Sequence, residues 1–432
     1  MKTNQEIAQY TLEALKKAGA DHAQCLVMQG KTDELNVDSG NFSLMRSLFE
    51  SSLNIKALKG GKKGSIRINR LEKEAIDAAV ADCMAAAESA LPDEAEQISP
   101  YTQNGSFSSG ILEPDRNRLF DRMEEYLAET GKTYPKVMME QLVADYSHAE
   151  TLYANTNGAE YAYEHGAYSF SATFSAQENG QTSSSSGSCV MLDSLEQPFL
   201  DIGLQRMLLE DCEKQIVTVP FEGKQLGTVI LTPDCLAEFL DMTFDSFLRD
   251  DALIDATSPW KDSLGKPVAD SRLTIRAVPL DDFVVCGERF TGDGYRSENM
   301  DIIKGGILQS FLLSQYGANK TGLARGKNAG RSLTVAPGDK ALGELVAGID
   351  RGLIVGRFSG GQPGVNGDFS GVAKNSFLIE NGRLTDAVSE TMISGNLAQL
   401  LGQLVGLTKE LVCDGVNLLP WAAFGGVTIS GK

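Results

Sequence analysis

Histidine is the residue that most limits the chemistry open to this chain. The sequence contains three histidines, His22, His148 and His165, among 432 residues. A zinc site for hydrolysis takes about three protein ligands plus an open position, usually with histidine among the ligands. These three stand in unrelated contexts, and none has a histidine partner at the i, i+4 spacing that places two ligands on one helix face. We therefore expect no conventional zinc-hydrolase site and no metal cofactor in this chain.

Carboxylates are the next residues whose spacing could support chemistry. Glu238, Asp241 and Asp245 are three and four residues apart in a segment, 233–250, that directly follows the strand-like run 227–231. On a helix these carboxylates share one face. We favour a solvated acidic face. The alternative is a site for a basic peptide or for a hard cation such as Mg²⁺, Ca²⁺ or Mn²⁺, which carboxylates suit better than they suit zinc.

Signatures of other catalytic classes are missing from the sequence. There is no G-x-S-x-G elbow and no Walker G-x-x-x-x-G-K-[ST] motif. Residues 322–327 come close to a phosphate-binding loop, but the spacing is one residue short and Asn328 replaces the Ser/Thr, so we predict an ordinary loop.

Glycines in residues 359–364 permit unusual backbone angles and a close approach of another backbone. Such a segment forms either ordinary turns or the wall of a cleft that pairs with an extended peptide by strand addition. We take Ser359, Gly360, Gly361 and Asp368 as candidate peptide-cleft residues.

Composition and charge narrow the possible partners. Hydrophobic residues make up 42% and charged residues 22%, which is typical of globular proteins. The net charge of -19 disfavours direct nucleic-acid binding, and the one basic cluster, Lys59, Lys62 and Lys63, lies at a glycine-flanked turn.

Residues 1–9 are polar, without the apolar region of a signal peptide, and no apolar run reaches the ~18 residues of a membrane helix. Seven dispersed cysteines without a C-x-x-C pair indicate reduced thiols, so we expect a cytoplasmic protein.

The order of apolar patterns predicts an α+β fold, with an N-terminal α/β region on a mixed or antiparallel sheet and a strand-rich C-terminal domain with a few helices. We place the domain boundary near Gln215, giving domains 1–215 and 216–432, with a possible subdivision near 92–113. Helices are expected at 4–19, 72–91, 114–129, 195–214, 233–250, 341–350 and 392–406, strands at 23–28, 43–57, 137–146, 151–153, 160–176, 227–231, 273–277, 300–313, 353–358 and 376–379, and a connecting loop at 92–112.

Five blocks follow one another along the chain: N-T-N-G at 155–158, V-I-L-T-P-D-C-L-A-E-F-L-D-M-T-F-D at 229–245, R-F-T-G-D-G at 289–294 followed by I-K-G-G-I-L at 303–308, G-R-F-S-G-G at 356–361, and G-D-F-S-G at 367–371, with L-I-E-N-G at 378–382 and S-G-N at 394–396 beyond them. In this content and order they resemble the TldD/PmbA family, also called modulator-of-gyrase proteins. The resemblance covers most of the chain.

The resemblance implies a division of labour between subunits. In that family the TldD type carries H-E-x-x-x-H on the central helix and a cysteine near the C-terminus, which together bind zinc, and the PmbA/TldE type lacks the motif. The two types pair into a heterodimer that degrades unfolded peptides and trims leader peptides. In this chain Leu240 stands at the first histidine, Asp241 at the glutamate, Asp245 at the second histidine and Cys413 at the cysteine. Because leucine cannot bind a metal, the chain resembles the PmbA/TldE type.

We therefore expect a non-metal-binding subunit that dimerises and helps to hold unfolded or extended peptides. Zinc, a metal-activated water and the glutamate base would belong to a TldD-type partner. One alternative is a peptide-binding homodimer without catalytic activity, and another is a hard-metal hydrolase that uses Asp241 and Asp245. Cys413 is interpreted as a small buried apolar residue rather than a former ligand.

Overall fold

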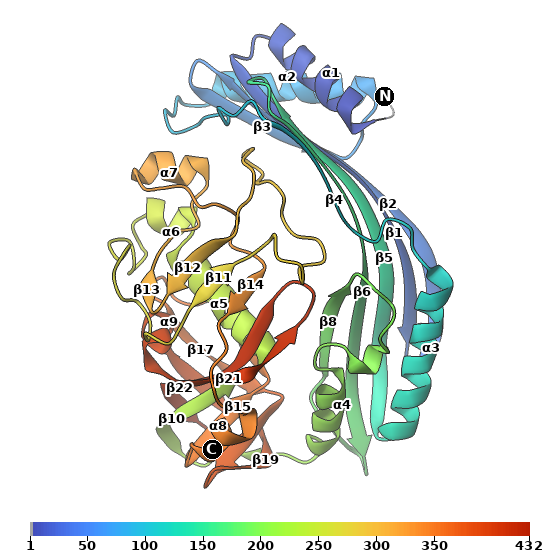
Figure 1. Cartoon of the computed structure of the whole chain (residues 1–432), viewed down its shortest axis with the longest axis vertical. Coiled ribbons are helices and arrows are strands. Elements are labelled where there is room, and N and C mark those ends of the chain that lie inside the picture. The colour runs from blue at the N-terminus through green and yellow to red at the C-terminus, as the bar shows by residue number, and fades with distance from the viewer. Residues whose placement is uncertain (1–2) are drawn as a thin grey trace.

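Two β-sheets, with helices packed on them, make up residues 3–432, the part of the chain that the computed structural model describes (Figure 1). The first two residues of the polar segment 1–9, in which we expect no signal peptide, lie outside the described residues. The first sheet takes its strands from residues 22–192 and the second from residues 219–430. This confirms the α+β fold with a strand-rich C-terminal part. No helix among residues 3–432 is long and apolar enough to cross a membrane.

The first sheet is built from long, curved strands (Figure 1). Its order is β3-β2-β1-β5-β6-β4, and β7 and β8 also pair with β6. All pairs are antiparallel except β4 with β6, so the sheet is mixed. The strands are β1 (His22–Asp38), β2 (Asn41–Lys59), β3 (Lys62–Ile68), β4 (Asn104–Gly110), β5 (Val137–Asn155), β6 (Glu160–Glu178), β7 (Gln181–Thr182) and β8 (Ser186–Leu192).

One face of the first sheet is covered by helices. Successive side chains of a strand alternate between faces, and the odd-numbered Cys25, Val27 and Val37 of β1 are buried beneath helices, whereas Leu26 packs on the other face against Phe290 of the C-terminal half. The sheet therefore joins the helical layer on one side and a C-terminal loop on the other. The helices are α1 (Asn4–Lys17), α2 (Lys73–Ser89), α3 (Arg116–Thr133) and α4 (Gln205–Lys214), with the 3₁₀ turn η1 (Phe199–Asp201) before α4.

The second sheet surrounds the central helix α5 (Pro233–Phe247), whose apolar side fills the main core. The strands are β9 (Val219–Pro220), β10 (Lys224–Leu231), β11 (Ile275–Ala277), β12 (Met300–Lys304), β13 (Ile307–Leu308), β14 (Leu333–Val335), β15 (Arg351–Val355), β16 (Arg357–Gly360), β17 (Asp368–Lys374), β18 (Ser376–Glu380), β19 (Arg383–Ser389), β20 (Met392–Asn396), β21 (Leu404–Cys413) and β22 (Leu418–Ser430). Shorter helices are α6 (Asp250–Ile254), α7 (Gln315–Thr321), α8 (Leu342–Ala347), α9 (Leu397–Leu400) and η2 (Leu401–Gln403).

Several predicted elements were wrong in type or extent. The helix predicted at 392–406 is instead β20 followed by single turns, because Met392–Ser394 pair with β22 and the Asn396 side chain caps α9. The predicted loop 92–112 contains β4, which is held by parallel pairing with β6. The predicted helix 195–214 begins only at Gln205, and the predicted strand 300–313 ends at Lys304 in a hairpin. The predicted strands 137–146 and 151–153 are one continuous strand, β5. Long-range pairing explains these differences, since local sequence does not encode it.

Candidate functional site

Helix α5 carries the segment that resembles the family's zinc helix. Thr232 caps its N-terminus by accepting a hydrogen bond from the Cys235 backbone N–H (3.4 Å), and Pro233 stands in the first turn, where its missing N–H costs nothing. Leu240 is 1% exposed and belongs to the main apolar core. The position that matches the first histidine therefore points into the core, away from the exposed carboxylates.

The exposed face of α5 carries Glu238, Asp241 and Asp245, as the predicted acidic face requires. Asp245 forms an ion pair with Arg249 (2.9 Å), four residues further along. Burial of the Asp241 carboxyl raises its pKa, the positive charge of Arg249 opposes this and the negative charge of Asp245 adds to it. Arg249 thus pairs with a carboxylate whose oxygens a bound metal ion would need.

Zinc does not fit these residues. A structural or catalytic zinc site needs thiolate, imidazole or carboxylate ligands gathered around one point. Leu240 offers no ligand atom, and the Asp245 carboxylate is already paired with a cation. Across residues 3–432 no group of three or more His, Cys, Asp or Glu side chains is placed to hold a metal ion. The same observation disfavours a hard-metal site at Asp241 and Asp245.

Cys413 ends β21, opposite Leu418 of β22, and is half-buried rather than fully buried as a core residue would be. Burial raises the pKa of its thiol, and the Gly415 backbone N–H, which donates to its sulfur (3.4 Å), opposes the shift. The charge of the neighbouring Asp414 acts on Asp234, in the first turn of α5. Asp245 is 11 residues further on, which is about 16 Å at the rise of an α-helix.

Asp234, one turn before Glu238 on the exposed face, has a strongly shifted pKa. Although the residue is exposed, its carboxyl is surrounded by protein, and this desolvation, with the charge of Asp414, raises its pKa from 3.8 to about 6. Because the folded pKa lies above the unfolded one, folding favours the protonated form, and stability decreases as pH rises from about 4 to 6.

We expect the Asp234 carboxyl to titrate with a midpoint near pH 6 in carboxyl-carbon NMR. The variant Asp414→Asn should lower that midpoint, because it removes a negative neighbour. Asp234→Asn should also flatten the loss of stability between about pH 4 and 6. A midpoint near 4 in the wild type would contradict the described burial of this carboxyl.

The candidate cleft residues Ser359 and Gly360 lie in β16, an edge strand. Among the described residues β16 pairs only with β17, so its other edge carries no strand partner. Gly360 is required by packing, since a Cβ there would lie 2.4 Å from the Phe358 ring. Gly361 follows in the exposed turn, where a Cβ would meet nothing within 4 Å. The structure thus places the glycine-rich segment at a free strand edge.

Asp368 opens β17 across the same hairpin and serves the turn. Its carboxylate accepts hydrogen bonds from the side-chain amides of Asn366 (2.8 Å) and Asn396 (2.8 Å), and the bond from Asn396, followed by the bond from Asn366, lowers its pKa. Asp368 therefore fixes the hairpin that carries β16.

Edge strand β16 lies against α5. The Phe358 and Phe239 rings contact edge to face (5.2 Å between centroids). Burial raises the pKa of Glu238, and the Phe358 backbone N–H and Arg357 oppose the shift. A cavity of about 220 Å³ separates these elements from the first sheet and is lined by Gly187, Asp234, Glu238, Arg357 and Asn375. The acidic face of α5 and the free strand edge therefore border one opening.

A second, larger cavity lies at the other end of α5. It measures about 430 Å³ and is lined by Arg249 and Asp250 from the α5–α6 junction and by Asp293, Leu312, Leu313 and Arg325. Arg249 also pairs with Asp245, so the cavity continues from the exposed face of α5. The lining combines charged groups with an apolar surface, which is typical of a binding pocket.

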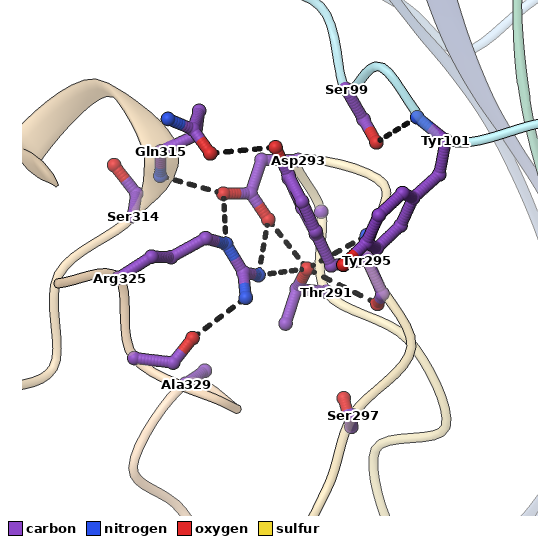
Figure 2. A network of polar contacts seen from close by, with 12 residues as sticks. Ser99, Tyr101, Thr291, Asp293, Tyr295, Ser297, Ser314, Gln315, Arg325 and Ala329 are labelled. Carbon is purple, nitrogen blue, oxygen red and sulfur yellow. Dashed lines mark hydrogen bonds and ion pairs between the residues drawn. The ribbon is translucent and has the colours of Figure 1, made fainter. Parts of the chain in front are cut away.

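A partly buried ion pair forms one wall of this cavity (Figure 2). The Asp293 carboxylate accepts hydrogen bonds from Arg325 Nε (3.1 Å) and Nη2 (2.9 Å) and from the Gln315 backbone N–H (2.8 Å). The Arg325 guanidinium lies over the Tyr295 ring (3.9 Å) and donates to the Gly326 carbonyl (2.6 Å). Burial alone would raise the pKa of Asp293, but the hydrogen bonds and charge of Arg325 outweigh burial and lower it. The Asp293 carboxylate in this wall is therefore ionised.

The loop that carries Asp293 is anchored on the first sheet. Phe290 stacks on Tyr161 (5.6 Å between centroids), and the Gln24 side chain donates to the Gly292 carbonyl (3.1 Å). Gly294 has φ +87°, and a Cβ there would lie 2.1 Å from the Tyr153 hydroxyl. Both the conformation and the close approach need glycine.

We expect Gly294→Ala to destabilise the protein by at least about 1–2 kcal/mol, because alanine is strained in the left-handed region and would also strike Tyr153. Gly292→Ala is the matched control two residues away, since a Cβ at Gly292 meets nothing within 4 Å. Urea unfolding of both variants measures the difference. Equal midpoints for the two would contradict the described packing of this loop.

Two lysines of the basic cluster near the glycine turn, Lys59 and Lys63, form ion pairs within the chain. Lys59 pairs with Glu88 (2.7 Å), Lys63 contacts Glu96, and Lys56 pairs with the same Glu96 (2.6 Å). These pairs reduce the positive charge available to a phosphate backbone.

Sequence reasoning missed Arg249, Asp293 and Arg325. A signal for Arg249 was present, since it stands four residues after Asp245, the spacing of a helical ion pair. Asp293 lay inside the block 289–294, and Arg325 inside the loop 322–327, which the structure does form as a loop. Their pairing joins two loops far apart in sequence and carries no local signal.

Family models, curated relatives and solved structures that match this chain all belong to one family. The model of the PmbA/TldA metallopeptidase central domain matches residues 110–213, and that of the C-terminal domain matches residues 224–431. The metalloprotease PmbA of Escherichia coli O157:H7 is 33% identical over 153 residues, which are 35% of this chain and 34% of that protein. A metalloprotease PmbA homologue of Haemophilus influenzae is 24% identical over 435 residues, 94% of this chain and 92% of that protein. The crystal structure of TldE from Thermococcus kodakarensis matches with a TM-score of 0.80 at 17% identity, over 98% of this chain and 99% of that chain, a likeness of fold.

Proposed function

The chain belongs to the PmbA/TldD metallopeptidase family, and from this premise we propose that it is a subunit without a zinc site of its own, which helps to hold an extended peptide for cleavage by a zinc-bearing partner. The proposal rests on the surroundings of the two residues of α5 that match the histidines of the family's zinc motif. Leu240 is a core residue, and Asp245 is paired with Arg249. Leu240 offers no ligand atom, and Asp245 would have to leave Arg249 to bind a metal.

The surroundings of α5 support peptide binding. β16 has no strand partner on its second edge among the described residues, and such an edge is the usual basis of strand addition, with the Phe358 N–H already bonded to Glu238. Glu238 lies next to this edge, Asp241 follows three residues further along α5, and both carboxylates favour neutral or basic side chains. The cavity of about 430 Å³ at Arg249 is large enough for a side chain at the end of that path. This chain binds and orients the peptide, and the ion-paired Asp293 and Arg325 form one wall of the path.

The chemistry belongs to the partner. A zinc ion in a TldD-type subunit supplies the activated water for hydrolysis. All seven cysteines of this chain are free thiols, which suits a reducing compartment, so the cytoplasm is the proposed location.

The test combines capture and activity. A tagged chain is isolated from its native extract, and the captured proteins are sequenced for an H-E-x-x-x-H subunit. Cleavage of an unfolded peptide is then measured for this chain alone, for the partner alone and for the mixture. We expect chelator-sensitive cleavage with the mixture and none with this chain alone. Chelator-sensitive cleavage by this chain alone overturns the proposal.

A matched pair of variants links the activity to the cleft. Glu238→Lys reverses a charge beside the free edge of β16, whereas Asp386→Lys reverses a charge on exposed β19. We expect the first to weaken peptide binding and the second to leave it unchanged. Binding by this chain without any zinc-bearing partner in the extract would instead favour the peptide-binding homodimer.

A further inference from the structure

Strand β8 has an edge that no other strand covers. Within residues 3–432, β8 pairs only with β6, and it lies on the side of the first sheet toward the C-terminal half (Figure 1). The Met191 backbone N–H points away from β6, since it donates to the Asp414 carbonyl in the turn between β21 and β22 (2.8 Å). Backbone groups alternate in direction along an antiparallel strand. The N–H and C=O groups of Gly187 and Cys189 therefore also point away from β6.

These outward backbone groups are free to bind another chain. Gly187 and Cys189 are both exposed, and among the described residues their N–H and C=O groups have no hydrogen-bond partner. Their side chains are small, so a second backbone can approach closely. The Gln205 side chain of α4 donates to the Ser188 hydroxyl (2.7 Å) and holds the strand in place. β8 thus presents the repeat of donors and acceptors that strand addition requires.

Two contacts with the C-terminal half bound the open stretch. At its start the Asn375 side chain donates to the Ser185 carbonyl (3.2 Å), and at its end Met191 is bonded to Asp414. The six steps from Ser185 to Met191 span about 20 Å at the rise of a strand. This length suits an extended segment of a few residues rather than a folded domain.

The edge of β16 offers less backbone for pairing. Its Phe358 N–H is bonded to Glu238, and the Gly356 carbonyl just before it accepts a hydrogen bond from the Thr232 hydroxyl (3.1 Å). Helix α5 therefore occupies part of the β16 edge, whereas β8 keeps two outward residues in succession free.

We propose that β8 binds an extended segment of the substrate peptide by strand pairing at Gly187 and Cys189. The inference rests on the proposed function and names the strand that holds the peptide. Asp234 and Glu238 of α5 line one cavity with Gly187, and Arg357 adds a single positive charge to these two negative ones. Charge complementarity therefore favours a peptide segment that carries Lys or Arg side chains.

Fluorescence anisotropy of a labelled, unfolded peptide of alternating Thr and Lys measures its binding to the full chain. Cys189→Pro removes one outward N–H and places a ring on the edge, so we expect the dissociation constant to rise at least about tenfold. The fold tolerates this change, because the Cys189 N–H lies outside the ladder with β6. Cys189→Ala is the matched control, since it keeps the N–H, and it should bind as tightly as the wild type.

Two measurements on the wild-type chain test the pairing without any substitution. The same peptide with N-methylated backbone amides cannot donate to β8, so its dissociation constant should also rise at least about tenfold. Hydrogen exchange followed by mass spectrometry should slow in residues 186–191 when the unmodified peptide is added, and should stay unchanged in residues 383–387 of exposed β19.

The outcomes separate this inference from the proposed function. A peptide that binds Cys189→Pro as tightly as Cys189→Ala, or that binds unchanged after N-methylation, overturns the pairing at β8 and leaves the proposed function standing. Chelator-sensitive cleavage by this chain alone overturns the proposed function and leaves the pairing standing. Absence of peptide binding by the wild-type chain overturns both. Slower exchange in residues 186–191 with a zinc-bearing partner but not with the peptide assigns the edge to that partner and overturns the inference.

Discussion

Replacing Asp293 by alanine should destabilise the protein by about 3 kcal/mol, because it leaves the Arg325 guanidinium partly buried without its carboxylate. This lies at the lower end of the usual cost, since the Asp293 side chain is 27% exposed and that of Arg325 is 15% exposed. Urea unfolding monitored by circular dichroism measures the loss. Arg325→Met should cost a similar amount, and the double variant should cost less than the sum of the two.

The Glu298–Lys327 pair provides a control within the same region. Its side chains are 64% and 56% exposed, so Glu298→Ala should cost less than about 1 kcal/mol. The loss for Asp293→Ala also depends on pH. Because the folded pKa of Asp293 is lowered, its contribution is present above the unfolded pKa and disappears as pH falls through the folded value. A loss no larger than that of Glu298→Ala would contradict the described burial of the pair.

Leu240→Ala should destabilise the protein by about 2–5 kcal/mol, because Leu240 is 1% exposed within the main core and its loss leaves a cavity. Leu240→His should be at least as harmful, since it buries a polar ring without an arranged partner. Denaturant unfolding midpoints measure both. Together, the two variants show whether Leu240 serves packing, as described, or belongs to a functional surface.

Asp241→Ala is the matched control on the exposed face of the same helix, and its effect should stay below about 1 kcal/mol. A Leu240 variant as stable as Asp241→Ala would mean that Leu240 is not in the core. A Leu240→His variant that gained tight zinc binding would show that the helix can still present a ligand there.

The central helix and its acidic face could be predicted from the sequence, because Thr232, Pro233 and the spacing of Glu238, Asp241 and Asp245 are local signals. The strand at 392–396 and β4 could not, since each exists through pairing with a distant strand. Locally, the segment 392–396 reads equally well as a helix, and the polar, serine-rich β4 reads as a loop.

The candidate site was predictable only in part. Leu240 and Asp245 could be located by resemblance to the zinc helix, and the glycines at 360–361 by their conformational freedom. The pairing of Asp293 with Arg325 could not be found, because it joins two loops that are separated by helix α7 and meet only in the fold. The Asp245–Arg249 ion pair had the right spacing, but only the fold shows that within residues 3–432 no group of three or more His, Cys, Asp or Glu side chains gathers around it.

The most direct measurement is the zinc content of the purified chain by mass spectrometry after incubation with excess zinc and removal of the unbound metal. The control is the H-E-x-x-x-H subunit treated in the same way. With Leu240 in the core and Asp245 paired with Arg249, we predict zinc far below one ion per chain for this protein, against about one per chain for the control. One tightly bound zinc per chain of this protein, lost together with peptide cleavage on chelation, would contradict the account.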